Sequence, residues 1–189
     1  MTTIVMVRKN NQIAIAADSQ TTFGDTRLTA EFDGASNKIF QFADSFLAIS
    51  GSAAHDLVLQ TALSKLKNPD FSSRLAIFET FRRLHPILKE DYFLKTEEEE
   101  NDPYESSQMT VVIANSHGIF GVYSMREVYE FQRFWAIGSG RDYAVGAMHA
   151  AYDSCETAKE VARVGVETGI TFDINSSLPI TLFGCKAAK

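Results

Sequence analysis

The first residues of the chain carry groups that could perform nucleophilic chemistry. Thr2 directly follows the initiator Met1, and a residue this small permits routine removal of the methionine. Removal would leave Thr2 with a free α-amine beside its hydroxyl. The α-amine titrates at about pH 7.7–8.0, so part of it is neutral near pH 7 and can serve as a base for the hydroxyl. Many proteins begin Met-Thr, and the pair alone also fits an ordinary first strand.

Composition and charge restrict the possible functions. The 189 residues are 45% hydrophobic and 22% charged, which predicts a single domain over residues 1–189 with a substantial core. The net charge is −6 and no basic stretch offers a phosphate-binding face, so we expect no nucleic-acid partner. No apolar run approaches the roughly 20 residues that span a bilayer, and the strand-like pattern after Met1 leads us to expect no secretory signal. We therefore expect a cytoplasmic protein without a membrane partner.

The cysteines and histidines do not predict a metal site. Cys155 and Cys185 form no CxxC pair, and we expect them to be reduced and structural. The histidines are scattered without the spacing of metal ligands, so we expect surface or core roles for them. They are His55, His85, His117 and His149.

The first 50 residues are dominated by strand-like segments. Residues 9–12 are turn formers that tolerate a left-handed backbone, and they separate two strands. Asp18 falls at the end of the second of these strands. Residues 19–34 are polar and rich in turn formers, which predicts an excursion of short strands and loops. The longer strands are expected at residues 3–8, 13–17, 37–42 and 46–50.

The remaining chain alternates paired helices with strands. Ser52 is the expected N-cap of a helix that ends at Lys67, and an acidic connector, residues 96–107, should follow the second helix. The apolar faces expected to be buried are Leu57, Leu59, Leu63 and Leu66, then Leu75, Phe78, Phe81, Leu84 and Leu88. The other helices are expected at residues 74–94, 143–152 and 157–168, and the other strands at 109–114, 119–123, 128–131, 134–137 and 180–184.

This order of elements predicts the architecture. Strand-rich runs that alternate with helix pairs fit two antiparallel sheets packed face to face, each covered on its outer side by two helices. Both faces of each sheet would then be buried, which explains continuously apolar strands such as residues 111–114. We therefore expect an α+β fold, a four-layer αββα sandwich.

Five short motifs, in order over almost the whole chain, carry a family resemblance. With them the sequence resembles proteasome β-type subunits and, more narrowly, the HslV peptidase and its bacterial proteasome-homologue relatives. The resemblance implies the N-terminal-nucleophile hydrolase fold and a threonine endopeptidase activity. The motifs are Thr2-Thr3-Ile4-Val5, residues 15–20 (IAADSQ), Asn37-Lys38-Ile39, residues 50–54 (SGSAA), and residues 136–140 (AIGSG) followed by Tyr143-Ala144.

The resemblance assigns a role to five residues. Thr2 Oγ would attack the scissile carbonyl, with its own amine as proton shuttle. Lys38 would place a cation beside Oγ, and Asp18 would keep Lys38 charged and oriented. Ser139 would hydrogen-bond the amine. The backbone N–H of Gly51 would be the oxyanion-hole donor, where a missing side chain lets the substrate approach closely.

Other family features match less closely. The family's additional acidic residue near the end of the last helix could be Glu167 or Asp173. Thr21, Ile49 and Ala53 correspond to the first specificity pocket and imply a modest apolar pocket, hence cleavage after apolar residues. The segment between Asp18 and Lys38 is a few residues longer than in HslV, so the assignment of Lys38 rests on its motif. The tail from Ser177 to Lys189 is also longer than in HslV, which favours the proteasome-homologue subgroup.

The resemblance also implies an assembly. We expect a homo-oligomer of stacked hexameric or heptameric rings that degrades unfolded polypeptides and works with an ATP-dependent unfoldase. No cofactor is needed for the chemistry, although a structural monovalent cation bound by backbone carbonyls is a family feature. Two alternatives stay open: a catalytically inactive ring scaffold and an N-terminal-nucleophile amidohydrolase for small amides. The direct Met1-Thr2 junction argues against the scaffold, and the lack of pocket-building insertions argues against the amidohydrolase.

Overall fold

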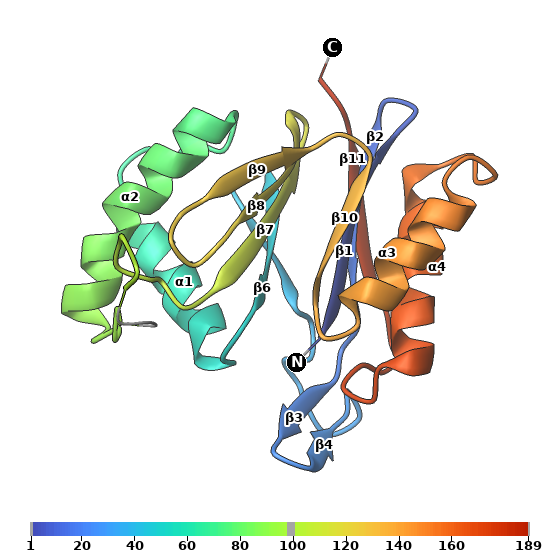
Figure 1. Cartoon of the computed structure of the whole chain (residues 1–189), viewed down its shortest axis with the longest axis horizontal. Helices are drawn as coiled ribbons and strands as arrows, with labels where there is room; N and C mark the ends of the chain where they lie inside the picture. The colour runs from blue at the N-terminus through green and yellow to red at the C-terminus, as the bar shows by residue number, and fades with distance from the viewer. Residues whose placement is uncertain (1, 98–100, 189) are drawn as a thin grey trace.

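The computed structural model describes residues 2–97 and 101–188. Within these residues two antiparallel sheets lie face to face, and a pair of helices covers the outer face of each sheet (Figure 1). The predicted four-layer αββα sandwich is therefore confirmed. No helix among the described residues is long and apolar enough to cross a membrane.

The four-stranded sheet has the order β10-β1-β2-β11 and brings the N-terminus to its centre. Asn10 and Asn11 both adopt positive φ, at 47° and 59°, in the turn between β1 and β2, as the sequence predicts. The register places Thr3 opposite Gly138 of β10 and Ile4 opposite Ala17 of β2. The ends of β2 and β10 therefore lie on either side of the first residues. The strands are β1 (Thr3–Lys9), β2 (Gln12–Ala17), β10 (Phe134–Gly138) and β11 (Thr181–Lys186).

The five-stranded sheet has the order β5-β6-β7-β8-β9. A separate two-stranded hairpin, β3 and β4, forms the predicted excursion and projects from the edge of the sandwich beside the N-terminus (Figure 1). The strands are β3 (Thr21–Phe23), β4 (Thr26–Leu28), β5 (Ile39–Phe42), β6 (Ser45–Ser50), β7 (Thr110–Asn115), β8 (Gly118–Val122) and β9 (Val128–Phe131).

Three apolar clusters hold the layers together. The central cluster fills the space between the sheets, where Ile4, Ile15 and Val112 are among the fully buried side chains. One outer cluster lies under α1 and α2, and the other lies under α3 and α4. Each sheet is thus buried on both faces, as expected. The helices are α1 (Ala54–Lys65), α2 (Arg74–Asp91), α3 (Arg141–Ala151) and α4 (Ala158–Phe172).

The structure corrects several details of the helices. The N-cap of α1 is Ala53, one residue beyond the predicted Ser52. Leu57 and Leu75 are exposed, at 72% and 71%, and Phe78 is also partly exposed, so the predicted apolar faces were wrong at these positions. The buried apolar residues of α2 follow the spacing i, i+4, i+7, i+11, and this face leaves Leu75 and Phe78 of the first turns on the outer side of the helix. It consists of Ile77, Phe81, Leu84 and Leu88.

The second helix of each pair, α2 or α4, begins with a side-chain cap. Ser73 accepts a hydrogen bond from Ala76 N at the start of α2, and Thr157 forms a capping box with Glu160 at the start of α4. Helix α4 extends to Phe172, beyond its predicted end. Of the predicted acidic connector, Glu98–Glu100 lie outside the described residues.

Candidate active site

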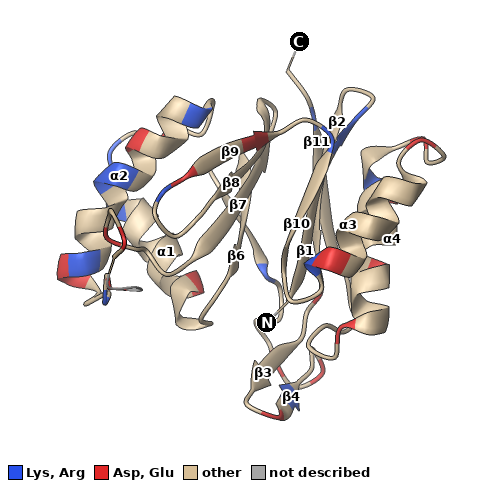
Figure 2. Cartoon of the chain, viewed as in Figure 1, with Lys and Arg blue, Asp and Glu red and all other residues tan. Residues whose placement is uncertain are grey.

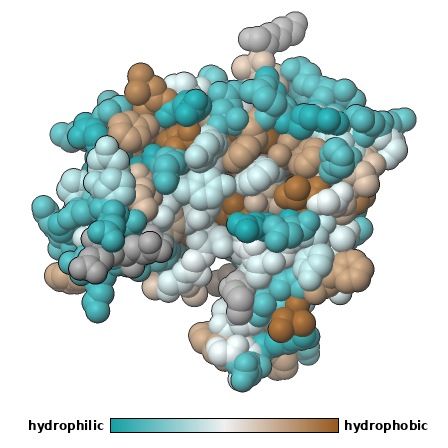
Figure 3. Space-filling view, viewed as in Figure 1, coloured by the Kyte–Doolittle hydropathy of each residue, from teal (hydrophilic) through white to brown (hydrophobic). Residues whose placement is uncertain are grey.

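Thr2 lies in the wall of a cavity of about 730 Å³. The residue is 4% exposed and directly precedes β1. The cavity is bordered by residues of the β3–β4 hairpin and by the junction of β6 and α1. In Figure 3 the surface is indented between the half that carries α1 and α2 and the hairpin. The Thr2 side chain is therefore placed where the two halves of the sandwich and the hairpin meet.

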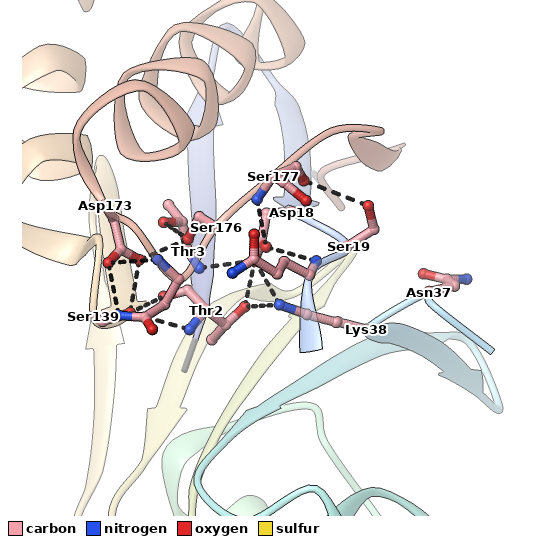
Figure 4. Close-up of polar contacts among 12 residues, drawn as sticks. Thr2, Thr3, Asp18, Ser19, Asn37, Lys38, Ser139, Asp173, Ser176 and Ser177 are labelled. Atoms are coloured by element: carbon pink, nitrogen blue, oxygen red, sulfur yellow. Dashed lines mark hydrogen bonds and ion pairs between the residues drawn. The ribbon is translucent and has the colours of Figure 1, made fainter. Parts of the chain in front are cut away.

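The Asp18 carboxylate organises the polar contacts around Thr2 (Figure 4). Asp18 is fully buried at the end of β2. Such a carboxylate requires several donors to remain charged inside a protein, and both of its oxygens accept hydrogen bonds. Oδ1 accepts from Thr2 Oγ1 (2.6 Å), Lys38 Nζ (2.7 Å) and Thr3 N (3.0 Å), and Oδ2 accepts from Gln20 N (2.9 Å) and Ser177 N (3.2 Å).

Lys38 forms the third corner of this cluster. Its Nζ donates to Thr2 Oγ1 at 2.9 Å as well as to Asp18. Burial lowers the pKa of Lys38, while the charge and hydrogen bond of Asp18, with a smaller effect of Asp173, oppose that shift. The ammonium group is thus held against the hydroxyl oxygen, where it can stabilise negative charge on Oγ.

A second cluster faces the backbone nitrogen of Thr2. Thr2 N donates to Ser139 Oγ at 3.2 Å, and Ser139 Oγ donates to Asp173 Oδ2 at 2.7 Å. Burial raises the pKa of Asp173, but hydrogen bonds from Ser139, Ser176 and Asn175 outweigh burial and lower the pKa overall. A charged Asp173 fixes the orientation of the Ser139 hydroxyl.

The structure distinguishes the two candidates for the additional acidic residue. Asp173 is the C-cap of α4 and contacts Ser139, whereas Glu167 pairs with Arg163 at the surface, at 3.6 Å. Because α4 is longer than predicted, its end reaches the site and Glu167 falls more than one turn short. Of the two predicted alternatives, Asp173 is therefore the one that lies beside Ser139.

Some site residues were missed by sequence reasoning. Thr3 Oγ1 lies 2.8 Å from Ser176 Oγ, and Ser176 Oγ donates to Asp173 at 2.7 Å. Ser177 N reaches Asp18 across 159 residues of sequence. The sequence signal for this loop was weak, because Asn175-Ser176-Ser177 resembles any polar connector after a helix.

Three glycines allow this close packing around Thr2 and Thr3. A Cβ on Gly138, which has φ +93°, would lie 2.1 Å from Thr2 O. A Cβ on Gly140 or Gly169 would lie 2.0 Å from Thr3 Oγ1 or 2.4 Å from Thr3 Cγ2. Real side-chain carbons do not approach so closely, so any larger residue would displace the strand that carries Thr2.

The remaining predicted residues lie around the cavity. Gly51, at the end of β6, has φ +149°, a conformation that L side chains rarely adopt, and it lines the same cavity as Thr2. Thr21, Ile49 and Ala53 also line this cavity. The cysteines are free, and the described residues contain no group of three or more His, Cys, Asp or Glu that could hold a metal ion.

The fold and this arrangement define a class of protein. A four-layer αββα sandwich that places a threonine at the head of its central strand, between an aspartate, a lysine and a serine, is the architecture of N-terminal-nucleophile hydrolases. The class follows from both the layers and the position of Thr2.

Comparison with known proteins gives the family. The structure of BPH from Thiobacillus denitrificans in complex with epoxomicin is similar at a TM-score of 0.92 and 41% identity, covering 99% of this chain and 100% of that chain. The ATP-dependent protease subunit HslV of Caldicellulosiruptor saccharolyticus is 26% identical over 184 residues, 96% of each chain. HslV from Trypanosoma brucei, at 19% identity and a TM-score of 0.71, shares the fold. No protein-family model matches. The chain belongs to the HslV-like, proteasome-type protease family and is a threonine peptidase.

Proposed function

We propose that this chain is the endopeptidase subunit of a self-compartmentalised ring complex and that Thr2 is its nucleophile after removal of Met1. The observation that carries the proposal is the position of Thr2 Oγ1, which lies 2.6 Å from Asp18 Oδ1 and 2.9 Å from Lys38 Nζ. A hydroxyl held between a carboxylate and an ammonium is suited to nucleophilic attack. Met1 lies outside the described residues.

The proposed reaction has two steps. Thr2 Oγ bonds to the scissile carbonyl carbon while its proton passes to the α-amine of the same residue, which Ser139 orients. Lys38 stabilises the charge on Oγ, and Gly51 N–H stabilises the tetrahedral oxyanion. The C–N bond then breaks, the amine returns the proton to the leaving nitrogen, and an ester on Thr2 remains. Water hydrolyses the ester in the second step and regenerates the hydroxyl.

An enclosed ring would explain how a broadly specific peptidase is tolerated in the cytoplasm, because only unfolded segments could reach the chamber. Large exposed apolar side chains support association between copies, since isolated soluble domains rarely expose extended apolar patches. Figure 3 shows hydrophobic side chains at the surface near α2 and near the β3–β4 hairpin. The exposed residues include Phe23, Phe32, Leu75, Phe172, Ile174 and Leu178. An ATP-driven unfoldase would supply folded substrates, as the designation of HslV as an ATP-dependent protease subunit suggests.

Intact-protein mass spectrometry with a peptide epoxyketone tests the proposal, a choice guided by the epoxomicin complex of BPH. We expect protein from cells to lack Met1 and to gain one inhibitor mass on Thr2. Thr2→Ala should remove the adduct and lower kcat/KM for peptides by about 10⁴-fold or more, and Lys38→Ala by at least about 10²–10³-fold, while the assembly mass is unchanged. Lys65→Ala, which removes only surface contacts with Asp91 and the Tyr92 ring, is the matched control.

Four outcomes would reject the proposal. Retention of Met1 in protein from cells, or an unlabelled Thr2, would favour the inactive scaffold. Normal peptide turnover by Thr2→Ala would place the nucleophile elsewhere. Hydrolysis of small amides without cleavage of peptides would favour the amidohydrolase.

A further inference from the structure

The cavity beside Thr2 has an apolar wall. Ile49 at the end of β6 and Ala53 and Leu57 at the start of α1 line this side, and Phe23 and Leu28 of the hairpin contribute to the opposite border. A cavity of about 730 Å³ with such a wall can accept a long side chain along its aliphatic part. Apolar contacts alone would favour a leucine or phenylalanine side chain.

The same cavity carries carboxylates without cationic partners. Asp33 accepts a hydrogen bond from Ala35 N at 2.9 Å, and Asp56 accepts one from Gln60 Nε2 at 3.0 Å. Neither forms an ion pair with any residue in 2–97 or 101–188. The lysine of the cavity, Lys38, is already paired with Asp18. The cavity therefore has an excess of negative charge in its polar wall.

A buried acceptor adds an independent observation. Gln20 lines this cavity and is fully buried. Its Nε2 donates to Ile174 O at 3.0 Å, which fixes the orientation of the amide, and its Oε1 has no donor among the described residues. A buried acceptor without a donor is unfavourable, and a hydrogen-bond donor that enters beside Gln20 would satisfy it. Burial also raises the pKa of Asp56, an effect that a neighbouring cation would reverse.

We propose that the cavity binds a long basic side chain, arginine or lysine, of the residue whose carbonyl carbon Thr2 attacks. The aliphatic stem lies against Ile49 and Ala53, and the cationic end donates hydrogen bonds to the carboxylates of Asp33 and Asp56. This inference rests on the proposed function. It replaces the apolar preference expected from sequence, because the apolar residues line only part of the cavity and serve the stem of the side chain.

Matched fluorogenic peptides test the inference on the assembled, processed enzyme. The peptides differ only at the residue before the scissile bond, which is arginine, citrulline or leucine; citrulline has the length of arginine without its charge. We expect kcat/KM to be about 10–100-fold higher for arginine than for citrulline. Asp56→Asn and Asp33→Asn should each reduce this ratio, and the double variant should bring it close to one. Asp153→Asn, which removes an exposed carboxylate paired with Arg133, should keep the ratio of the unchanged enzyme.

The outcomes separate this inference from the proposed function. Equal or faster cleavage after citrulline or leucine by the unchanged enzyme would overturn the basic preference, as would an undiminished ratio in both single variants. If an apolar epoxyketone still labels Thr2 in that case, the peptidase assignment stands and only the specificity fails. If no peptide is cleaved and Thr2 is not labelled, the proposed function fails as well. Labelling of Thr2 in each variant also verifies that it is folded.

Discussion

The two helix-covered halves of the sandwich are packed in different ways. Under α1 and α2 the buried side chains are large, such as Leu59, Phe81 and Leu84. Helix α4 instead buries Ala162, Gly165 and other small residues against β1 and β2. The charged residues of both halves lie mainly on their outer surfaces (Figure 2). The half with α1 and α2 is thus stabilised by large buried side chains. In the half with α4, small residues let the helix backbone approach the backbone of the sheet closely.

This difference matches the distribution of the residues around Thr2 in the candidate active site. Thr2, Asp18, Ser139 and Asp173 all come from the four-stranded half with α4, where small residues permit positions to be fixed closely. Of the six candidate site residues named here, Lys38 and Gly51 come from the edge of the other half. We infer that substitutions in the two halves have different effects. Those under α1 and α2 should mainly lower the free energy of unfolding, and those under α4 should mainly lower kcat/KM.

The largest effect is expected in the bulky half. Leu84→Ala removes a fully buried side chain from α2 and should lower the free energy of unfolding by about 2–5 kcal/mol, because it leaves a cavity. Leu84 belongs to the cluster under α1 and α2 and does not line the cavity beside Thr2, so kcat/KM of the folded protein should change by less than about threefold. Chemical denaturation and peptide assays measure the two quantities. Leu75→Ala on the same helix, at an exposed position, should change stability by no more than about 0.5 kcal/mol. If Leu84→Ala loses more activity than its loss of folded protein explains, then the half with α1 and α2 also affects catalysis and the proposed difference between the halves is wrong.

The same contrast explains what could be predicted from sequence. The layers and the succession of strands and helices along the chain follow from local periodicity and turn residues, and the motifs located Thr2, Asp18 and Lys38. The exposure of Leu75 was missed because the apolar residues of α2 could be divided into more than one helical face. The choice of Asp173 over Glu167 depended on where α4 ends, and helix ends are poorly defined by sequence.

Contacts of long range were also beyond sequence reasoning. Ser177 N bonds to Asp18, and Ser176 contacts Thr3, from a loop near the C-terminus. No local pattern marks these serines, because their role exists only when β11 pairs with β2. The need for glycine at position 169 has the same origin, since the atom it avoids belongs to Thr3.

In the close-packed half, Gly169→Ala should damage catalysis. Its Cβ would lie 2.4 Å from Thr3 Cγ2, so the start of β1 must move by a substantial part of an ångström. A misplacement of about 1 Å can cost about 100-fold in rate, and we expect a fall in kcat/KM of about that size. Overpacking should also lower the free energy of unfolding by about 1–3 kcal/mol. Steady-state kinetics with denaturation curves will measure both.

Gly146→Ala on α3 is the control for that substitution. Apart from the chain neighbours of Gly146 and the backbone of its own helix, no atom of the described residues lies within 4 Å of a Cβ built on Gly146. Alanine should therefore raise helix stability by about 0.5–1 kcal/mol and leave kcat/KM unchanged. If Gly169→Ala behaves like Gly146→Ala, then α4 does not position the site through Thr3.

The pH dependence of kcat/KM should report one group from each half, the α-amine of Thr2 and the side chain of Lys38. The α-amine must be neutral to accept a proton, so below its ordinary pKa of about 7.7–8.0 the rate should rise about tenfold per pH unit. Lys38 must be charged to stabilise Oγ. Burial lowers its pKa from 10.5, with Asp18 opposing the shift, so the rate should fall again as the pH rises through a value below 10.5. A pH–rate profile with a short peptide measures both limbs. A rate that stays level up to pH 10.5 would show that the charge on Lys38 is either fully protected by Asp18 or not used in catalysis, and kcat/KM of Lys38→Ala at neutral pH decides between these.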